Sequence, residues 1–256
     1  MSHLPAPIFS LKHLPVLNVH SIESLGTFDG PGIRLVFFLQ GCNFKCLYCA
    51  NPDTIAFEGG NPYATEDLVA MARRQQPFFG KKGGITVSGG EPLIQAKGLI
   101  ELFKALKEAG FHTCIDTNGS LLNDDVKELL DYTDLVLLDI KQAQEERHRK
   151  LTGRSNARTL AFADYLAQRG KATWIRYVLV PGYSDAEEDL HALGQRIKDM
   201  HNVEKLEIQP YHKLGVHKYA SLGWEYALSD VPANTAEALL KAKALFQAYV
   251  PEVVIN

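Results

Sequence analysis

The stretch Gly41-Cys42-Asn43-Phe44-Lys45-Cys46-Leu47-Tyr48-Cys49 brings three of the four cysteines of the chain onto one short segment. Three cysteines within eight positions suit disulfide bonds poorly and are typical of metal thiolates in a reducing compartment. No fourth cysteine lies near them in sequence, so a [4Fe-4S] cluster held here would keep one iron without a protein thiolate. A structural zinc ion completed by a histidine suits the same three sulfurs. This segment alone predicts a metal site and leaves the metal open.

Short apolar strands alternate with helices on both sides of the cysteine segment. We predict six main strands, at residues 33–40, 85–88, 112–116, 135–140, 173–180 and 203–209. The predicted helices span residues 63–75, 95–108, 124–131, 159–169, 186–200 and 235–249, and Thr65 is the expected N-cap of the first. Such strands, joined by connections long enough for crossover helices, indicate a parallel sheet covered by helices. A doubly wound sheet and a full or partial barrel both fit this pattern.

Polar groups follow nearly every predicted strand. They are Ser88-Gly89-Gly90-Glu91-Pro92, Asp116-Thr117-Asn118-Gly119, Asp139-Ile140-Lys141 and His212, and Arg176 lies within an otherwise apolar strand. Each has an ordinary explanation taken alone, such as a glycine-rich turn, a helix cap or a local salt bridge. A parallel barrel, however, carries the C-terminal ends of all its strands to one face. We therefore favour a barrel in which these groups meet the cysteines.

Two of these motifs have a predicted geometry. The glycines before Glu91 would expose backbone groups and let a ligand approach closely, while the Glu91 carboxylate would attract an ammonium group. Asp139 and Lys141 are two residues apart in extended chain, so their side chains are expected on the same side of the sheet. Cys114 stands alone in an apolar segment and is predicted to be a core residue.

Composition narrows the class of protein. The 256 residues are 46% hydrophobic and 22% charged, which suits a globular chain with a substantial core. A formal charge of -3 gives no basic face for nucleic acid. Three prolines interrupt the first 20 residues, so they do not form a signal peptide, and no apolar run is long enough to span a membrane. We expect a cytoplasmic protein that binds neither nucleic acid nor membrane.

The cysteine segment and the Gly89-Gly90-Glu91 motif resemble those of radical S-adenosylmethionine (SAM) enzymes. More closely, the chain resembles the pyruvate formate-lyase activating enzymes, a family of glycyl-radical enzyme activases. The similarity runs from about Ser21 to the last helix and includes residues 27–34, 116–119, 138–141, 174–177 and 210–212. It implies an α/β fold, a partial (β/α)6 TIM-like barrel with a radical SAM core. Residues 1–18 would form an N-terminal extension, and residues 19–256 a single domain.

The resemblance also implies an activity. A [4Fe-4S] cluster and SAM would generate a 5'-deoxyadenosyl radical, which takes a hydrogen atom from a glycine of pyruvate formate-lyase. A flavodoxin- or ferredoxin-type protein would supply the electron. The implied cluster ligands are Cys42, Cys46 and Cys49, and the residues implied around SAM are Tyr48, Ala50, Gly89, Gly90, Glu91, Asp139, Ile140, Lys141 and His212. Asp116, Thr117 and Asp139 match positions of a monovalent cation, and Asp29 and Arg176 match positions facing the glycine loop of the partner.

Two features distinguish this chain from other proteins that it resembles. The family commonly has histidine after the third cysteine, where this chain has Ala50, so the cluster potential or the handling of substrate is expected to differ. Residues 51–86 contain no cysteine, whereas several related activases carry additional cysteine clusters there, which favours pyruvate formate-lyase as the partner. Three alternatives stay open: activation of another glycyl-radical enzyme, radical SAM chemistry on a small molecule, and a non-enzymatic zinc-binding interaction protein.

Overall fold

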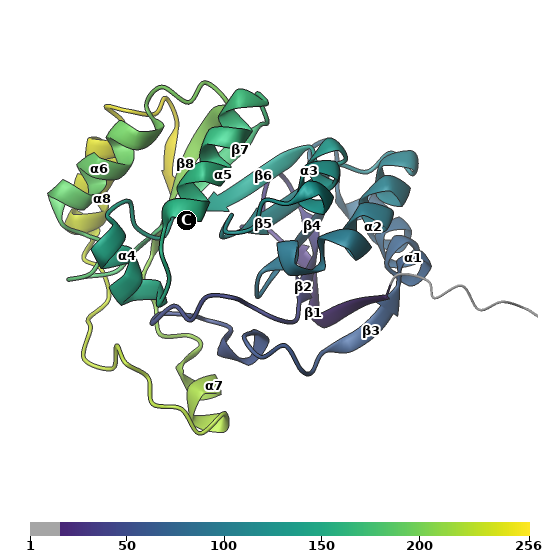
Figure 1. Cartoon of the computed structure of the whole chain (residues 1–256), viewed down its shortest axis with the longest axis horizontal. Helices are drawn as coiled ribbons and strands as arrows, with labels where there is room; N and C mark the ends of the chain where they lie inside the picture. The colour runs from purple at the N-terminus through teal and green to yellow at the C-terminus, as the bar shows by residue number, and fades with distance from the viewer. Residues whose placement is uncertain (1–15) are drawn as a thin grey trace, which may run out of the picture.

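The computed structural model describes residues 16–256, which form one nine-stranded sheet with helices packed against it (Figure 1). The strand order is β3-β1-β2-β4-β5-β6-β7-β8-β9. The strands are β1 Val16–Gly26, β2 Arg34–Leu39, β3 Asn61–Ala64, β4 Gly84–Gly89, β5 Thr113–Thr117, β6 Leu135–Asp139, β7 Thr173–Leu179, β8 Val203–Pro210 and β9 Val253–Ile255. The helices are α1 Thr65–Gln75, α2 Ala96–Glu108, α3 Asp124–Asp131, α4 Glu145–Thr152, α5 Ala157–Gln168, α6 Glu187–Ile197, α7 Val216–Ser221 and α8 Ala236–Phe246, with 3-10 turns at Pro52–Thr54, Gln76–Phe78 and Pro92–Gln95.

The six predicted strands are β2, β4, β5, β6, β7 and β8, which lie side by side and run parallel. β9 extends the parallel sheet at one edge, whereas β1 and β3 add antiparallel strands at the other. In the described part of the chain β3 and β9 do not pair with each other, so the sheet stays open. The predicted α/β fold with a partial barrel is confirmed.

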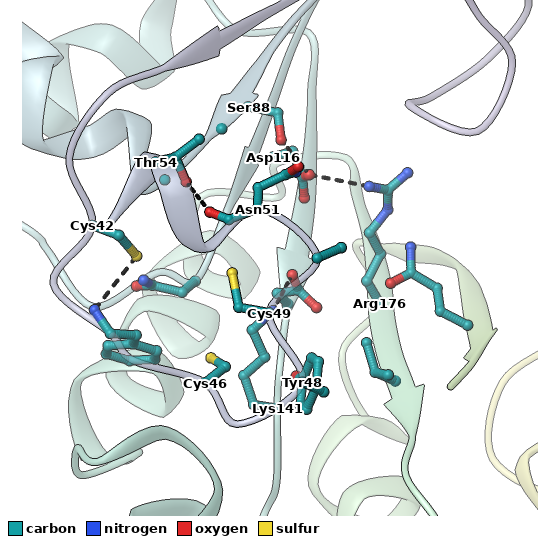
Figure 2. Close-up of a pocket in the computed structure, with 18 of the residues that line it drawn as sticks. Cys42, Cys46, Tyr48, Cys49, Asn51, Thr54, Ser88, Asp116, Lys141 and Arg176 are labelled. Atoms are coloured by element: carbon teal, nitrogen blue, oxygen red, sulfur yellow. Dashed lines mark hydrogen bonds and ion pairs between the residues drawn. The ribbon is translucent and has the colours of Figure 1, made fainter. Parts of the chain in front are cut away.

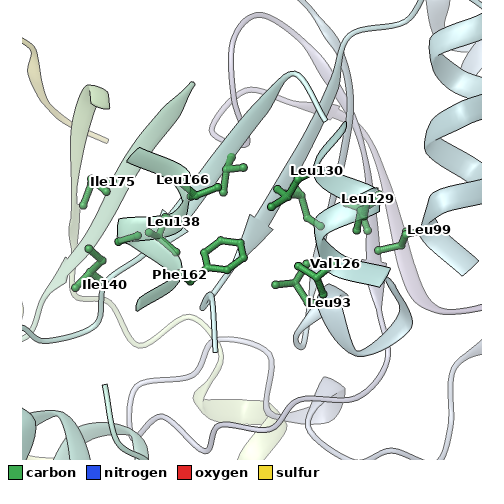
Figure 3. Packing of buried hydrophobic residues seen from close by; sticks show 14 of the residues in the cluster. Leu93, Leu99, Val126, Leu129, Leu130, Leu138, Ile140, Phe162, Leu166 and Ile175 are labelled. Atoms are coloured by element: carbon green, nitrogen blue, oxygen red, sulfur yellow. The ribbon is translucent and has the colours of Figure 1, made fainter. Parts of the chain in front are cut away.

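Alternation along the parallel strands sorts side chains between two faces. In β6, Val136 and Leu138 belong to the large hydrophobic core, whereas Leu135 and Leu137 form a separate small cluster with Cys114. The large core lies between the sheet and its helices, and Figure 3 shows Leu138 close to Phe162 and Leu166 of α5. The second face is the inside of the partial barrel. Cys114 is a fully buried residue there, as predicted.

The inner face turns from apolar to polar toward the C-terminal ends of the strands. Asp139 continues the inner row of Leu135 and Leu137. By the same period of two, Asp116 follows Cys114 in β5, and Arg176 lies inward in β7 because Ile175 and Tyr177 pack in the outer core. The polar residues at this end of the barrel interior therefore belong to largely apolar strands, and they point inward because side chains alternate between the two faces of each strand.

Several details of the sequence prediction were wrong. The helix expected at residues 63–75 begins at Thr65, because residues 61–64 form β3 against β1. Ala64 is the N-cap, so the prediction for Thr65 was wrong, and the Thr65 hydroxyl has no hydrogen-bond partner among the described residues. The strands β1, β3 and β9 and the helices α4 and α7 were not predicted. Of the predicted extension, residues 1–15 lie outside the described residues, and residues 16–18 already belong to β1. No helix within residues 16–256 has the length and apolar character needed to cross a bilayer.

Candidate active site

A cavity of about 620 Å³ opens at the C-terminal ends of the parallel strands. Most of the predicted site residues line it: Asp29, Cys42, Cys46, Tyr48, Cys49, Ala50, Gly89, Gly90, Asp116, Thr117, Asp139, Lys141, Arg176 and His212. Figure 2 shows the cysteines on one side of the cavity and Arg176 across it. Glu91 and Ile140 are not part of the lining. The predicted site residues in this lining are up to 183 positions apart in sequence, from Asp29 before β2 to His212 after β8.

The cysteine segment is fixed by backbone hydrogen bonds at its start and in its middle. Gly41 N–H donates to Thr54 O at 2.8 Å, and Cys42 N–H donates to Ile55 O at 3.1 Å. Farther along, Lys45 N–H and Leu47 N–H donate to carbonyl oxygens at the C-terminal end of α4, at 3.1 and 2.9 Å. A last-turn helical carbonyl has no partner within its own helix, so it is free to accept such a bond. The unpredicted helix α4 therefore positions the cysteine segment.

The three cysteines face a space with room for a cluster. A zinc ion requires its thiolates within about 2.3 Å of one point. Among the described residues, no three His, Cys, Asp or Glu side chains are arranged to hold one metal ion. The four irons of a cubane occupy different corners, so its thiolates lie farther apart, and Cys42, Cys46 and Cys49 all face one large cavity. Closed structural zinc sites leave no such space.

The cysteine side chains are thiols in the metal-free protein. Burial raises the pKa of the Cys42 thiol to about 12, although the Phe44 N–H donates to its sulfur at 3.4 Å and opposes this effect. Burial likewise raises the pKa of Cys46 and Cys49. A metal binds the thiolate form, so metal binding here is coupled to release of protons.

The Gly-Gly-Glu motif packs against the start of the cysteine segment. A Cβ on Gly90 would lie 2.1 Å from Gly41 O, and one on Gly89, which has a φ of +116°, would lie 2.2 Å from Leu39 N. Only glycine tolerates the close contact at either position, and at Gly89 also the positive φ. The close approach predicted for these glycines is therefore made by the chain itself, while both residues still line the cavity.

Glu91 points away from the cavity, contrary to its predicted role toward an ammonium group. It is 0% exposed. Its Oε1 accepts from Thr117 Oγ1 at 2.6 Å and Leu93 N at 3.0 Å, and its Oε2 accepts from Asn118 N at 2.8 Å. The carboxylate therefore ties the end of β4 to the end of β5. Ile140 is also fully buried, and its side chain lies in the outer core (Figure 3).

Two buried carboxylate oxygens in the cavity lack hydrogen-bond partners. Asp116 Oδ2 accepts from Ser88 Oγ at 2.7 Å, and Asp139 Oδ2 pairs with Lys141 Nζ at 2.5 Å. The Oδ1 atoms of both aspartates are buried and unpartnered among the described residues. Buried polar atoms are normally satisfied, so an unpartnered pair in one cavity fits an absent cationic ligand. Thr117 lines the same cavity, although its hydroxyl donates to Glu91.

Lys141 lies between the cysteines and Tyr48. Its ammonium is 5.6 Å from the centre of the Tyr48 ring, and the predicted shared side of Asp139 and Lys141 is confirmed by their ion pair. Burial is the largest single effect and lowers the pKa of Lys141, but the Asp139 carboxylate and the other groups around the ammonium together outweigh it and raise the pKa. The Tyr48 hydroxyl is buried without a partner among the described residues. A polar ligand can therefore gain a hydrogen bond here.

Arg176 and Asp29 form the opposite wall. Arg176 pairs with Asp116 and with Glu207, each at 3.1 Å, and its Nη1 lies 3.8 Å from Asp29 Oδ1. It also donates to the Phe28 carbonyl. Burial raises the pKa of Asp29 to about 6, although Arg176 opposes this effect. This wall is charged on the inside, and the exposed Phe28 ring makes the adjacent rim apolar.

Sequence reasoning missed several lining residues. Ser88 was visible within the glycine-rich motif but was given no role, and Gln209 directly precedes the Pro210-Tyr211-His212 segment. Asn256 reaches the cavity because β9 pairs with β8, which no local pattern indicates. Ala50 lines the cavity at the position where histidine was expected, and Gly215 packs on its backbone.

Comparison with known proteins gives consistent matches over the chain. A family model described as the radical SAM superfamily matches residues 36–193. The pyruvate formate-lyase 1-activating enzyme of Escherichia coli K12 is 46% identical over 239 residues, which are 92% of this chain and 97% of that protein. The pyruvate formate-lyase-activating enzyme of Staphylococcus aureus USA300 is 48% identical over 233 residues, which are 88% of this chain and 93% of that protein.

Solved structures are similar at lower identity. A domain of a pyruvate-formate lyase-activating enzyme from Bacteroides vulgatus has a TM-score of 0.58 at 21% identity and covers 68% of this chain and 99% of its own. SuiB of Streptococcus suis, bound to the precursor peptide SuiA, has a TM-score of 0.65 at 18% identity and covers 86% of this chain and 48% of its own. At these identities the likeness concerns the fold alone.

Proposed function

The chain belongs to the radical SAM superfamily and, within it, to the pyruvate formate-lyase activating enzymes, and we propose that it installs a glycyl radical on pyruvate formate-lyase. One observation carries this proposal: the three cysteines and the Asp29–Arg176 pair line opposite walls of one cavity. When bound, a [4Fe-4S] cluster and SAM supply an electron and a 5'-deoxyadenosyl radical able to take a hydrogen atom from glycine.

Each wall has a proposed task. Cys42, Cys46 and Cys49 hold the cluster and leave one iron open to SAM. Tyr48, Ala50, Gly89, Gly90, Lys141 and His212 surround SAM, whereas Glu91 and Ile140 act only by supporting the ends of β4 and β6, because their side chains do not line the cavity. A buried cationic lysine and an unpartnered tyrosine hydroxyl suit the carboxylate of an amino acid.

The unpartnered aspartate oxygens support the proposed cation. Asp116 and Asp139 each present one buried acceptor oxygen to the cavity, and oxygen ligands suit hard cations. Thr117 lies beside them. We propose that Asp116, Thr117 and Asp139 would hold a monovalent cation at this position, where its charge would offset that of the two carboxylates.

The opposite wall is proposed to receive the partner. Asp29 and Arg176 present charged hydrogen-bonding groups at the depth of the cavity, where an extended peptide backbone can pair with them. The electron is proposed to come from a flavodoxin- or ferredoxin-type protein, and a reducing cytoplasm would keep the three thiols free for iron.

The test is activation of the partner under anaerobic conditions. The chain is reconstituted with iron and sulfide, supplied with SAM and a reductant, and mixed with pyruvate formate-lyase. We expect a glycyl radical on the partner in electron paramagnetic resonance spectra. SAM cleavage without a radical on the partner would contradict the partner and favour a small-molecule substrate, whereas zinc without iron or sulfide in anaerobically purified protein would contradict the class.

Cysteine variants provide the matched control. Replacing Cys42, Cys46 or Cys49 with serine should abolish both the iron-sulfur absorbance and SAM cleavage, because serine lacks the thiolate that iron requires. The Cys114→Ser variant should retain both, since Cys114 is a buried residue of β5 that does not line the cavity. Full cluster content in any of the three cavity variants would contradict the ligand assignment.

A further inference from the structure

The loop that carries Asp29, residues 27–33 between β1 and β2, has bends but no helix or strand of its own. Gly30 and Gly32 in this loop have φ angles of +119° and +71°. Such a loop does not fix the direction of its side chains through regular backbone hydrogen bonds. Other groups must therefore hold Asp29 in the cavity wall.

Two consecutive carbonyl groups of this loop are held from inside the barrel. The Phe28 carbonyl accepts from Arg176 of β7, and the Asp29 carbonyl accepts from Thr86 Oγ1 of β4 at 2.6 Å. The Thr86 hydroxyl in turn accepts from Arg34 Nε of β2 at 2.9 Å. The guanidinium of Arg176 thus holds the Phe28 carbonyl directly, and the guanidinium of Arg34 holds the Asp29 carbonyl through the Thr86 hydroxyl.

An arginine is unusual at the buried position of Arg34. It is 0% exposed and is the largest of the fully buried side chains. Its hydrogen-bond acceptors within residues 16–256 are all uncharged: Thr86 Oγ1, the carbonyl groups of Ile85, Pro31 and His112, and the ring of His112. Burying a cation without an ion-pair partner is costly, and an apolar residue would avoid that cost. Packing alone therefore does not explain an arginine here.

The charge does affect the Thr86 hydroxyl. A hydroxyl that accepts a hydrogen bond from a cation becomes a stronger donor, because hydrogen bonds in a chain polarise one another. The next acceptor in this chain is the Asp29 carbonyl. The same guanidinium also donates through Nη1 to the Pro31 carbonyl at 3.5 Å, so it contacts the following turn of the loop as well.

We propose that Arg34 and Thr86 are positioning residues for the partner, which hold the Asp29 backbone so that its carboxylate faces the glycine loop. The proposal rests on the proposed function, because it assigns Asp29 to the partner. Neither Arg34 nor Thr86 lines the cavity, so neither touches SAM, the cluster or the partner. Their loss should therefore affect hydrogen transfer to the partner more than SAM cleavage.

The experiment compares Thr86→Val with Thr86→Ser in the cluster-loaded enzyme. Valine keeps the shape of threonine and removes the hydroxyl, whereas serine keeps the hydroxyl. Two readouts are taken from each sample: SAM cleavage with reductant but without partner, and glycyl radical formed on pyruvate formate-lyase per SAM consumed. For Thr86→Val we expect SAM cleavage within about twofold of wild type and a fall of about tenfold in radical per SAM, the scale expected when a positioned group shifts by a fraction of an ångström.

The outcomes distinguish positioning of Asp29 by the Thr86 hydroxyl from a merely structural role of Thr86. Recovery of radical yield in Thr86→Ser supports positioning by the hydroxyl. Equal losses of both readouts in Thr86→Val, or no loss in either, would overturn the proposal. If Thr86→Val does not load a cluster, Arg34→Lys decides in its place. Lysine keeps the charge but lacks the fixed fork of donors with which Arg34 bonds Thr86 Oγ1 and the Ile85 carbonyl, so the same selective loss is expected. A wild-type enzyme that forms no radical on the partner would instead overturn the proposed function.

Discussion

At the scale of single residues, Glu91 shows how a motif can be identified correctly and its role wrongly. The Gly-Gly-Glu pattern indicated a carboxylate near the site, and the residue does lie beside it. Its direction depends on where β5 runs, since Thr117 and Asn118 supply two of its three donors. A sequence pattern gives the residue type at a position, while the neighbouring strand determines where the side chain points.

Replacing this carboxylate should destabilise the fold. In Glu91→Gln an amide NH2 group would face at least one of the three donors that now bond to the carboxylate. A buried donor left without an acceptor costs about 1–3 kcal/mol. We expect the free energy of unfolding, measured with urea, to fall by about that amount. The control Glu128→Gln, a half-exposed surface residue, should change it by less than about 0.5 kcal/mol. Equal effects of the two variants would show that Glu91 has no special structural role.

At the scale of elements, helix α4 holds the cysteine segment although its sequence did not indicate a helix. Residues 145–152 contain one leucine among charged and polar side chains, so no apolar period is visible. The helix is stabilised by packing instead. His148 is fully buried and its ring meets the Phe44 ring edge to face at 5.5 Å, next to the cysteines. Tertiary contacts of this kind cannot be read from a local pattern.

His148 should make stability depend on pH. Its Nδ1 donates to the Arg154 carbonyl at 2.7 Å, and its Nε2 is buried without a partner among the described residues. Burial lowers the pKa of His148 below its usual 6.5. The unfolded chain therefore takes up a proton near pH 6.5 and the folded chain only at lower pH, so this contribution to stability is present above 6.5 and is lost as the pH falls through the folded pKa.

The test compares wild type with His148→Asn, which keeps a donor for the Arg154 carbonyl but does not titrate. Between about pH 7.5 and about pH 5.5, the free energy of unfolding of wild type should fall more steeply than that of the variant. Other titrating groups are common to both proteins and cancel in the comparison. Parallel curves would contradict a neutral, buried His148.

At the scale of the whole molecule, the sequence was sufficient for the sheet and for most of the cavity. Six strands, their parallel direction and the face where their ends meet follow from apolar runs and connection lengths. The edge strands β3 and β9 were not predicted, because residues 61–64 and 253–255 are too short to show a period, and the longer edge strand β1 was not predicted either. The residues at the rim of the cavity were not predicted either, because the rim is formed by loops that lie far apart in sequence.

The cavity rim should bind the partner through apolar contacts. Phe28 and Leu214 line the cavity from loops far apart in sequence, and they are 63% and 76% exposed. Exposed apolar residues at a cavity mouth are typical of an interaction site. Truncating either to alanine should raise KM for pyruvate formate-lyase by about 5- to 30-fold, because each loses about 1–2 kcal/mol of apolar burial. Leu240→Ala, which removes a residue 62% exposed on α8 and outside the cavity lining, should leave KM unchanged. An equal effect of Leu240→Ala would contradict a partner site at this rim.

The most direct test follows the hydrogen atom that moves. Pyruvate formate-lyase is prepared with glycine deuterated at its α-carbon, and the cluster-loaded enzyme is incubated with it, SAM and reductant under anaerobic conditions. The 5'-deoxyadenosine formed is then examined by mass spectrometry. If the cavity brings SAM and a glycine of the partner together, the product carries deuterium in amounts that match the glycyl radical. Unlabelled 5'-deoxyadenosine formed while SAM is consumed in the presence of the labelled partner would contradict hydrogen transfer from the partner glycine.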